Sequence, residues 1–297
     1  MPSIKVSILG SNTFTSQMPR IREAFQSLGN IISEESPDLI YSNDPTGYPK
    51  AMYLKKRFPN SYLILNFLDI PWHMPNVEKQ TKLLVENFFN LADMTTTISF
   101  KVKKDLKKFL QKNIEVIYNP IKDVFYDKNI KKNNTFLYVG RANDKIKRIN
   151  LVKESLEKID NSINNVKICG SEDPGFGEYL GIVSDEKLNE LYNCSKYLYL
   201  PSKAEGLGLP MIEAMICGSL PIACDDNETA KEFLPEDFIC KPDSQSIVNK
   251  IKELDKDYDS KRILALDYGK KYKIQFDKTS IAKNILNIFN SNNKTKS

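Results

Sequence analysis

The sequence predicts an α/β protein with two doubly wound domains, each built on a parallel sheet. Short apolar, β-branched runs alternate with longer helical patterns along the chain, and this alternation is typical of parallel sheets with right-handed crossovers. A polar stretch rich in lysine and asparagine, residues 122–134, separates two such series and indicates a domain boundary. The length of 297 residues also suits two domains.

The first series holds five strand candidates, each a short run of apolar or β-branched residues. They are residues 4–9, 38–41, 62–67, 94–98 and 114–118. Helical patterns lie between them, at residues 19–28, 49–57, 77–90 and 101–111. Asn119 and Pro120 end the fifth strand, directly before the polar linker.

The second series follows the same rhythm. Its strand candidates are residues 135–139, 166–169, 197–200 and 220–223, and its helices are residues 144–159, 185–194 and 209–217. Ligands of doubly wound sheets bind outside the carboxyl ends of the strands. Each domain is therefore expected to present a ligand-binding edge there.

Composition excludes several classes of protein. With 41% apolar residues, 27% charged residues and a net charge of +5, the chain is neither disordered nor fibrous. No apolar run approaches the roughly 20 residues of a membrane-spanning helix, and the apolar stretch of the opening segment is too short for a signal peptide. The five cysteines form no C-x-x-C pair, so we expect reduced thiols in a cytoplasmic protein. Basic residues are mostly lysine, without aromatic interleaving, so no nucleic-acid partner is expected.

Residues 198–225 carry the most informative pattern. A buried strand candidate runs into a loop at Pro201, where Gly206 and Gly208 allow the backbone to turn tightly and approach a ligand closely. Pro210 suits the first turn of a helix, where its missing N–H group costs nothing. A second buried strand candidate follows that helix, so the segment predicts a strand–loop–helix–strand unit.

Two glutamates lie eight positions apart in this unit, Glu205 on the loop and Glu213 on the helix. Both can face one cleft, into which the N–H groups of the helix start point, and such a cleft suits a phosphate or a sugar hydroxyl. The alternative is a pair of surface carboxylates that only interact with the helix dipole. The glycines and the proline around the pair favour the ligand site.

The same segment closely resembles a known family pattern. Residues 201–221 resemble P-S-x-x-E-G-[FL]-G-[LM]-x-x-x-E-A-M-x-x-G-x-P, the E-x7-E signature of retaining GT-B glycosyltransferases of family 4. Upstream, the run from Tyr138 to Arg141, followed by Lys147, resembles that family's G-R…K stretch. Residues 181–188 resemble its G-x-V-[SP]-x-x-x-L loop and helix.

The resemblance extends over most of the chain and implies an architecture. Residues 276–289 are similar to the family's closing helix. A GT-B chain has two Rossmann-like domains facing a cleft. The resemblance thus implies an acceptor-side domain at residues 1–122, a nucleotide-sugar donor domain at 123–275 and a crossover helix at 276–292 that returns to the first domain.

The implied activity is retaining hexosyl transfer from a nucleotide-sugar, UDP- or GDP-linked, to a hydroxyl acceptor, with no other cofactor. Negative charge develops on the departing diphosphate, and Arg141 and Lys147 are expected to neutralise it together with the helix start. A metal ion is then not required. Asp225 and Asp226 are adjacent, unlike the Asp-x-Asp site of metal-dependent transferases.

The two glutamates are expected to divide the donor between them. Glu213 suits a bidentate grip on the ribose hydroxyls, and Glu205 suits a hydroxyl of the donor sugar. The turn at Gly170, with Ile182 and Val183, is expected to line the base pocket. The other expected donor-binding residues, all at the start of the E-x7-E helix, are Gly206, Leu207, Gly208 and Leu209.

Loops of the first domain are expected to hold the acceptor. Asn12 and Asp44 follow the first two strands, and Asp69 and His73 follow the third. We expect Asp69 or His73 to orient the acceptor hydroxyl. For His73, the single histidine of the chain, a structural hydrogen bond is an equally good interpretation.

The stretch from Phe100 to Lys112 combines an apolar helical face with six lysines. One interpretation is an interfacial helix that attaches the protein peripherally to an anionic membrane surface. The other is an ordinary helix of a Rossmann-like domain with a solvated lysine face.

Two alternative functions remain open from the sequence. One is a nonhydrolysing nucleotide-sugar epimerase of similar architecture, although a single histidine supplies few of the acid–base groups that epimerisation needs. The other is a catalytically inactive subunit that binds a sugar nucleotide. Glu205, Glu213, Arg141 and Lys147 are all present, which favours an active transferase.

Overall fold

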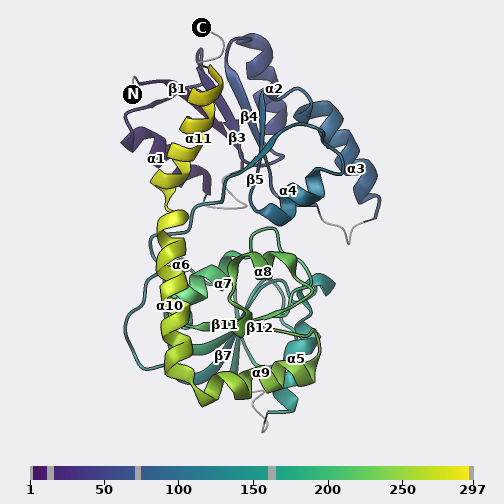
Figure 1. Ribbon diagram of the computed structural model, residues 1–297, viewed down its shortest axis with the longest axis vertical. Coiled ribbons are helices and arrows are strands. Elements are labelled where there is room, and N and C mark those ends of the chain that lie inside the picture. The colour runs from purple at the N-terminus through teal and green to yellow at the C-terminus, as the bar shows by residue number, and fades with distance from the viewer. Residues whose placement is uncertain (1–2, 12–16, 71–74, 160–164, 294–297) are drawn as a thin grey trace. The chain divides into compact units, whose positions relative to one another are not determined.

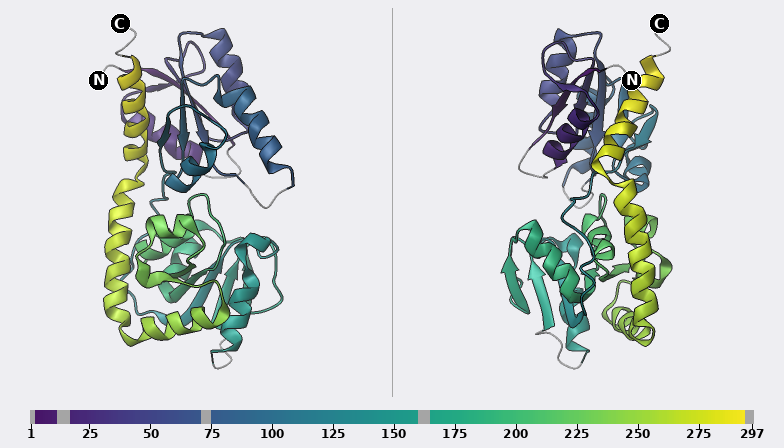
Figure 2. Two further views of the ribbon diagram at one scale, coloured as in Figure 1. Left: turned by 45° about the vertical axis from the view of Figure 1, so that its right-hand side comes forward. Right: turned by 90° about the vertical axis from the view of Figure 1, so that its left-hand side faces the viewer.

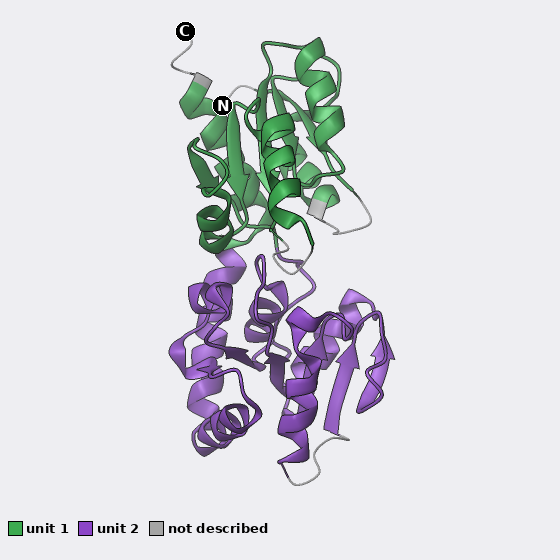
Figure 3. Ribbon diagram, turned by 90° about the vertical axis from the view of Figure 1, so that its right-hand side faces the viewer, with its two compact units in different colours: residues 1–120, 275–297 green, residues 121–274 purple. Residues whose placement is uncertain are grey.

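The computed structural model describes residues 3–11, 17–70, 75–159 and 165–293 (Figure 1). The chain forms two compact units (Figure 3). Unit 1 comprises residues 1–120 and 275–297, and unit 2 comprises residues 121–274. Each unit is a parallel sheet with packed helices, so the predicted fold class is confirmed.

Unit 1 has a six-stranded parallel sheet in the order β2-β1-β3-β4-β5-β6. Its strands are β1 Lys5–Leu9, β2 Ile31–Ile32, β3 Leu39–Ser42, β4 Tyr62–Phe67, β5 Met94–Thr97 and β6 Ile114–Val116. Its helices are α1 Gln17–Ser27, α2 Tyr48–Arg57, α3 Val77–Leu84 with the π-helical turn η1 Val85–Phe89, α4 Phe100–Leu106 and α11 Lys278–Asn293. The sequence missed β2, because two residues on the sheet edge, one of them exposed, leave no pattern.

Unit 1 completes its core with a helix from the far end of the chain. α11 packs beside α1, as Figures 1 and 2 show. The ring of Phe289 in α11 meets Tyr62 of β4 edge-on, with ring centroids 6.0 Å apart. Just before α11, Phe276 stacks on Tyr118 at 4.5 Å. The buried α11 residues that join the core around β1 are Ile281, Ala282, Ile285, Leu286 and Phe289.

Unit 2 has a second six-stranded parallel sheet, in the order β12-β11-β10-β7-β8-β9. Its strands are β7 Asn133–Val139, β8 Val166–Cys169, β9 Glu178–Gly181, β10 Ser195–Leu200, β11 Leu220–Cys224 and β12 Ile239–Cys240. Its helices are α5 Ile149–Glu157, α6 Asp185–Cys194, α7 Leu209–Ile216, α8 Glu228–Phe233, α9 Ser244–Lys256 and α10 Tyr258–Gln275, with 3-10 turns η2 Lys145–Lys147 and η4 Glu236–Phe238.

The helix predicted at residues 144–159 is broken. The Asp144 side chain caps the short turn η2 by accepting a hydrogen bond from the Ile146 N–H group at 3.0 Å. Arg148 then takes a left-handed conformation, with φ of 49°, and α5 starts only after it. A capped turn and a left-handed residue therefore override the helical spacing of the apolar residues.

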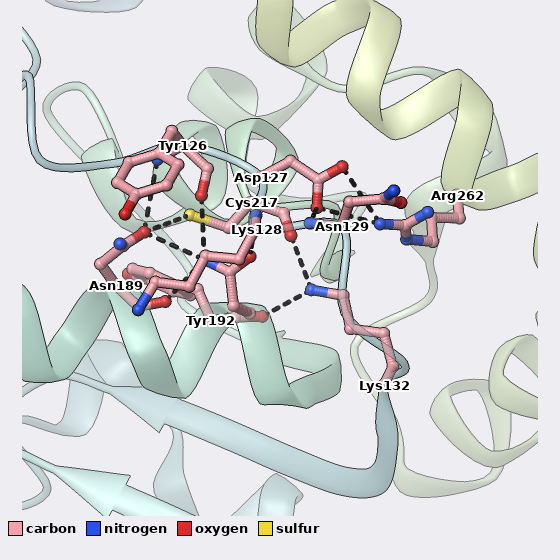
Figure 4. A network of polar contacts seen from close by, with 10 residues as sticks. Tyr126, Asp127, Lys128, Asn129, Lys132, Asn189, Tyr192, Cys217 and Arg262 are labelled. Atoms are coloured by element: carbon pink, nitrogen blue, oxygen red, sulfur yellow. Dashed lines mark hydrogen bonds and ion pairs between the residues drawn. The ribbon is translucent and has the colours of Figure 1, made fainter.

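The predicted polar linker is docked along unit 2. Two buried asparagines of α6, Asn189 and Asn193, form side-chain hydrogen bonds with the backbone of the linker. Asn189 accepts from the N–H group of Tyr126 at 3.3 Å. Asn193 donates to the Tyr126 carbonyl at 2.9 Å and accepts from the Lys128 N–H group at 2.7 Å. The linker is thus held on α6 through its backbone groups (Figure 4).

Within the described residues, no helix has the length and apolar character needed to cross a membrane. The five cysteines are all present as free thiols.

Candidate active site

The loop between β10 and α7 forms the centre of the candidate site. Gly208, with φ of 71°, occupies the left-handed position that begins α7 and that a side chain would strain. Asn227 donates to the carbonyl of Ser202 at 3.0 Å and holds the loop from the side of β11. No side chain of the described chain caps the start of α7. An uncapped helix start is suited to a phosphate or another anion.

The structure brings Lys147 and Glu205 together. The Lys147 Nζ lies 2.6 Å from the Glu205 Oε1, and the two side chains are 18% and 10% exposed. The turn that carries the lysine is tied to the glutamate loop, since the N–H group of Lys203 donates to the Ile146 carbonyl at 2.9 Å. Two residues that were predicted separately for the site therefore lie in contact, although they stand 58 positions apart.

Arg141 lies at the same edge of the sheet, directly after β7. Its guanidinium donates to Asp144 at 2.7 Å, and 61% of its side chain is exposed. The charges around the buried Tyr138 hydroxyl shift its pKa. Burial raises the pKa of Tyr138, the carboxylates of Glu205 and Asp144 raise it further, and Arg141 lowers it.

Glu213 is buried in α7, with 8% exposed. The Tyr192 hydroxyl donates to its Oε2 at 3.1 Å. Burial raises the pKa of Tyr192 well above its usual value, and the charge of Glu213 adds to the effect, so the hydroxyl stays protonated. Sequence reasoning did not assign Tyr192 to the site, although it stands in a segment that resembles the family.

The turns after β7 and β8 touch. A Cβ atom on Gly170 would lie 2.0 Å from the carbonyl oxygen of Gly140, so only glycine fits there. The Gly140 N–H group donates to the Cys169 carbonyl at 2.9 Å, and the Gly170 N–H group donates to the Gly181 carbonyl at 3.0 Å. Ile182, next in the chain, is 84% exposed. The backbones of the two turns therefore lie in contact, and the exposed side chain beside them is that of Ile182.

Glu172, which follows the Gly170 turn, is a further residue that sequence reasoning missed. Its Oε2 atom is buried, and among the described residues it has no hydrogen-bond partner. Its charge also raises the pKa of the Tyr138 hydroxyl. No motif letter marks it, so only the structure places this carboxylate near the site.

Two predicted acceptor residues, Asp44 and Asp69, have partners within unit 1. Asp44 accepts hydrogen bonds from the N–H groups of Ser11 at 2.8 Å and Thr46 at 2.9 Å. Asp69 pairs with Lys101 at 3.1 Å. The two other predicted acceptor residues, Asn12 and His73, lie outside the described residues.

A buried polar chain lies at the same edge of this sheet, and the sequence did not predict it. Asn66 of β4 donates to Asn43 at 3.0 Å and accepts from Thr96 of β5 at 2.9 Å. The Tyr41 hydroxyl of β3 also donates to Asn43 at 3.0 Å.

The lysine-rich stretch forms a shorter helix than predicted. α4 has seven residues, and its apolar face, including Val102 and Leu106, packs in the core. Several lysines of the stretch, in α4 and after it, bind within unit 1: Lys101 and Lys108 pair with Asp105, and Lys112 donates to the Asn90 and Ala92 carbonyls.

One of the two adjacent aspartates after β11 has a cationic partner. The Arg148 guanidinium donates to both carboxylate oxygens of Asp226. In the described part of the chain, no three His, Cys, Asp or Glu side chains gather as metal ligands.

A family model matches part of this chain. Residues 177–271 match the family model for glycosyl transferases group 1. This match includes the loop, both glutamates and Tyr192.

Two curated relatives are O-antigen mannosyltransferases. The chain is 42% identical over 60 residues to O-antigen chain mannosyltransferase B of Escherichia coli, covering 20% of this chain and 16% of the relative. It is 28% identical over 180 residues to O-antigen chain mannosyltransferase RfbU of Salmonella typhimurium, covering 53% of this chain and 50% of the relative. The chain thus spans half or less of the length of these relatives.

A solved structure shares the fold along nearly the whole chain. Anabaena HepE, in complex with UDP and glucose, superimposes with a TM-score of 0.77 at 16% identity, covering 97% of this chain and 100% of HepE. The two units therefore have the Rossmann-like folds of the GT-B architecture.

Proposed function

We propose that the protein is a retaining glycosyltransferase that moves a sugar from a nucleoside-diphosphate donor to a hydroxyl acceptor. The observation that carries the proposal is the Lys147–Glu205 pair beside the uncapped start of α7. The segment around Glu205 matches glycosyl transferases group 1. The names of the curated relatives and the UDP and UDP-glucose complexes of HepE support the same class of donor.

Each polar group has a task in this reaction. Lys147, Arg141 and the N–H groups at the start of α7 stabilise the charge that develops on the diphosphate. Glu205 holds a hydroxyl of the donor sugar, and Glu213 holds the ribose. In unit 1, Asp69 or His73 orients the acceptor hydroxyl.

A ligand panel tests the proposed function. Purified protein is mixed with UDP, GDP, ADP and their sugars, and its melting temperature is measured. One nucleotide should stabilise the fold by about 2.7 kcal/mol when present at 100 times its dissociation constant. Its sugar conjugate should then release the diphosphate when acceptor is added. Stabilisation by none of them overturns the proposal.

The same panel separates the alternatives. An epimerase would convert the donor sugar without any acceptor. An inactive binding subunit would be stabilised by the nucleotide-sugar but would release no diphosphate from it.

Transfer is expected to survive removal of divalent metal. Cationic side chains supply the charge that a metal ion would otherwise supply, and Asp226, in the adjacent pair that follows β11, is bound by Arg148. Turnover in EDTA should equal turnover in Mg²⁺ within about twofold, by analogy with sites that use such cations. Loss of activity in EDTA with rescue by Mn²⁺ would point to a carboxylate metal site.

The product is expected to keep the anomeric configuration of the donor. An inverting transfer needs a general base opposite the leaving group, and in this architecture that base is expected just after the first strand. The residues at that place in the sequence, 10–16, contain no His, Asp or Glu. Nearby Asp44 already accepts hydrogen bonds from Ser11 and Thr46. In a front-face transfer the departing phosphate oxygen accepts the proton of the acceptor, and the protein positions both substrates. Proton NMR of the product from an α-linked, gluco-configured donor should show a small anomeric coupling. A β-linked product would exclude retention.

A further inference from the structure

We propose that Tyr192 is a positioning residue that holds the Glu213 carboxylate in the orientation needed to grip the ribose of the donor. This inference rests on the proposed function. It assigns a role to a residue that touches the glutamate and not the substrate.

The contact lies in the interior of unit 2. Tyr192 stands in the last turn of α6 and is fully buried, and Glu213 lies on α7 with 8% exposed. The hydroxyl donates to the Glu213 Oε2 over 3.1 Å. A hydrogen bond from a buried hydroxyl to a carboxylate is among the stronger neutral-to-charged contacts in proteins. A carboxylate accepts about four hydrogen bonds in total, and the bond from Tyr192 takes one of these acceptor positions.

Tyr192 is itself held from the docked linker (Figure 4). The ring of Phe125 meets the Tyr192 ring edge-on, with centroids 5.8 Å apart and planes at 73°. The Lys132 Nζ donates to the Tyr192 carbonyl at 2.8 Å and to the Cys217 carbonyl at 2.6 Å. This lysine therefore joins the C-terminal ends of α6 and α7, the two helices that carry Tyr192 and Glu213. Because both the ring and the backbone of Tyr192 are held in place, its hydroxyl stays directed at Glu213.

A fixed carboxylate matters most for a ligand with two neighbouring hydroxyls. Bidentate binding of a diol requires a defined carboxylate plane, which a freely rotating glutamate would have to adopt at an entropic cost. A site built to bind hydroxyl groups also rejects the analogue that lacks them. Tyr192 should therefore strengthen binding of the ribose form selectively.

The test is Tyr192→Phe, which removes one oxygen and keeps the ring. The probes are UDP and 2′,3′-dideoxy-UDP, or the guanine pair if GDP is the stabilising nucleotide. Titration calorimetry should show the dissociation constant of the ribose form rising about fivefold to tenfold, the loss expected for one hydrogen bond. The constant of the dideoxy form should stay within about twofold, because the deleted contact serves only the diol.

Tyr197→Phe is the matched control. The Tyr197 hydroxyl is also buried and also donates to a carboxylate, Asp255, at 2.7 Å, but on another part of unit 2. This variant should bind both probes as the wild type does. Phe125→Leu, which loosens the Tyr192 ring from the linker, should reduce the preference for ribose in the same direction as Tyr192→Phe.

The outcomes separate the inference from the function on which it rests. If Tyr192→Phe weakens the binding of both probes equally, Tyr192 has a general packing role. If the variant changes the binding of neither probe, Tyr192 has no role in binding. Either result overturns the inference. If Glu213→Ala leaves the preference for ribose intact, the ribose role of Glu213 itself is wrong. Transfer activity in the wild type decides the proposed function separately.

Discussion

Replacing Lys147 with alanine is expected to lower kcat/KM by on the order of 10²-fold or more, which corresponds to about 2.7 kcal/mol of lost transition-state stabilisation. The lysine Nζ is 2.6 Å from Glu205 and its side chain is largely buried. In the proposed reaction its charge therefore acts on the diphosphate through little water, where electrostatic effects are large. Arg141→Ala is expected to have an effect of the same order. Initial rates at several donor concentrations measure both.

Lys145→Ala is the matched control for the lysine. Lys145 belongs to the same short turn η2 and is exposed, so this variant changes the net charge equally without touching Glu205. Its kcat/KM should stay within about twofold of the wild type, because Lys145 has no expected role at the diphosphate and its exposed charge is screened by solvent. Equal losses in both lysine variants would mean that only the general charge of the turn matters.

Glu213→Ala and Glu205→Ala are expected to fail in different ways. Glu213→Ala should raise the dissociation constant of UDP or GDP by about tenfold to a hundredfold, because it removes two charge-assisted hydrogen bonds to the ribose. Glu205→Ala should leave that dissociation constant nearly unchanged, because the bare nucleotide has no donor sugar for Glu205 to hold. The same variant should lower kcat by on the order of 10²-fold. Calorimetry with the bare nucleotide and turnover with the nucleotide-sugar separate the two effects.

The buried position of Glu213 requires a stability control. Alanine at this position leaves the Tyr192 hydroxyl without its acceptor in the interior, at a cost of about 1–3 kcal/mol in the free energy of unfolding. Glu213→Gln keeps the shape and an acceptor oxygen, so it should unfold nearly as the wild type does. It should nevertheless bind the nucleotide more weakly. Equal loss of nucleotide affinity in the Glu205 and Glu213 variants would contradict the division of roles.

The sequence predicted the central strands well because burial on both faces leaves long apolar runs. β4, Tyr62–Phe67, is buried at every position, and its pattern was plain. The edge strands β9 and β12 are short or half-exposed, so they carry no such pattern. The break before α5 depends on the cap at Asp144 and the left-handed Arg148, which the spacing of apolar residues does not encode.

The candidate site was predictable where backbone geometry dictates residue type. Gly208 begins α7 in a left-handed conformation and Gly170 has no room for a side chain, so both positions need glycine, while their roles in donor binding stay predictions. Residues that act through tertiary contacts were not predicted from the sequence. Tyr192 is aromatic and would be assigned to the core, and its bond to Glu213 spans 21 positions. The buried carboxylate oxygen of Glu172 likewise has meaning only beside the strand ends that surround it.

The placement of α11 in unit 1 has a consequence for biosynthesis. Unit 2 is an uninterrupted run of chain, so it can fold as soon as it leaves the ribosome. The first sheet is translated earlier, yet the helix that completes its core emerges after all of unit 2. At about 5–20 residues per second, the roughly 160 residues from β6 to α11 take some ten to thirty seconds to synthesise. Throughout that interval the nascent sheet exposes an apolar face, which makes the growing chain a natural client for holding chaperones.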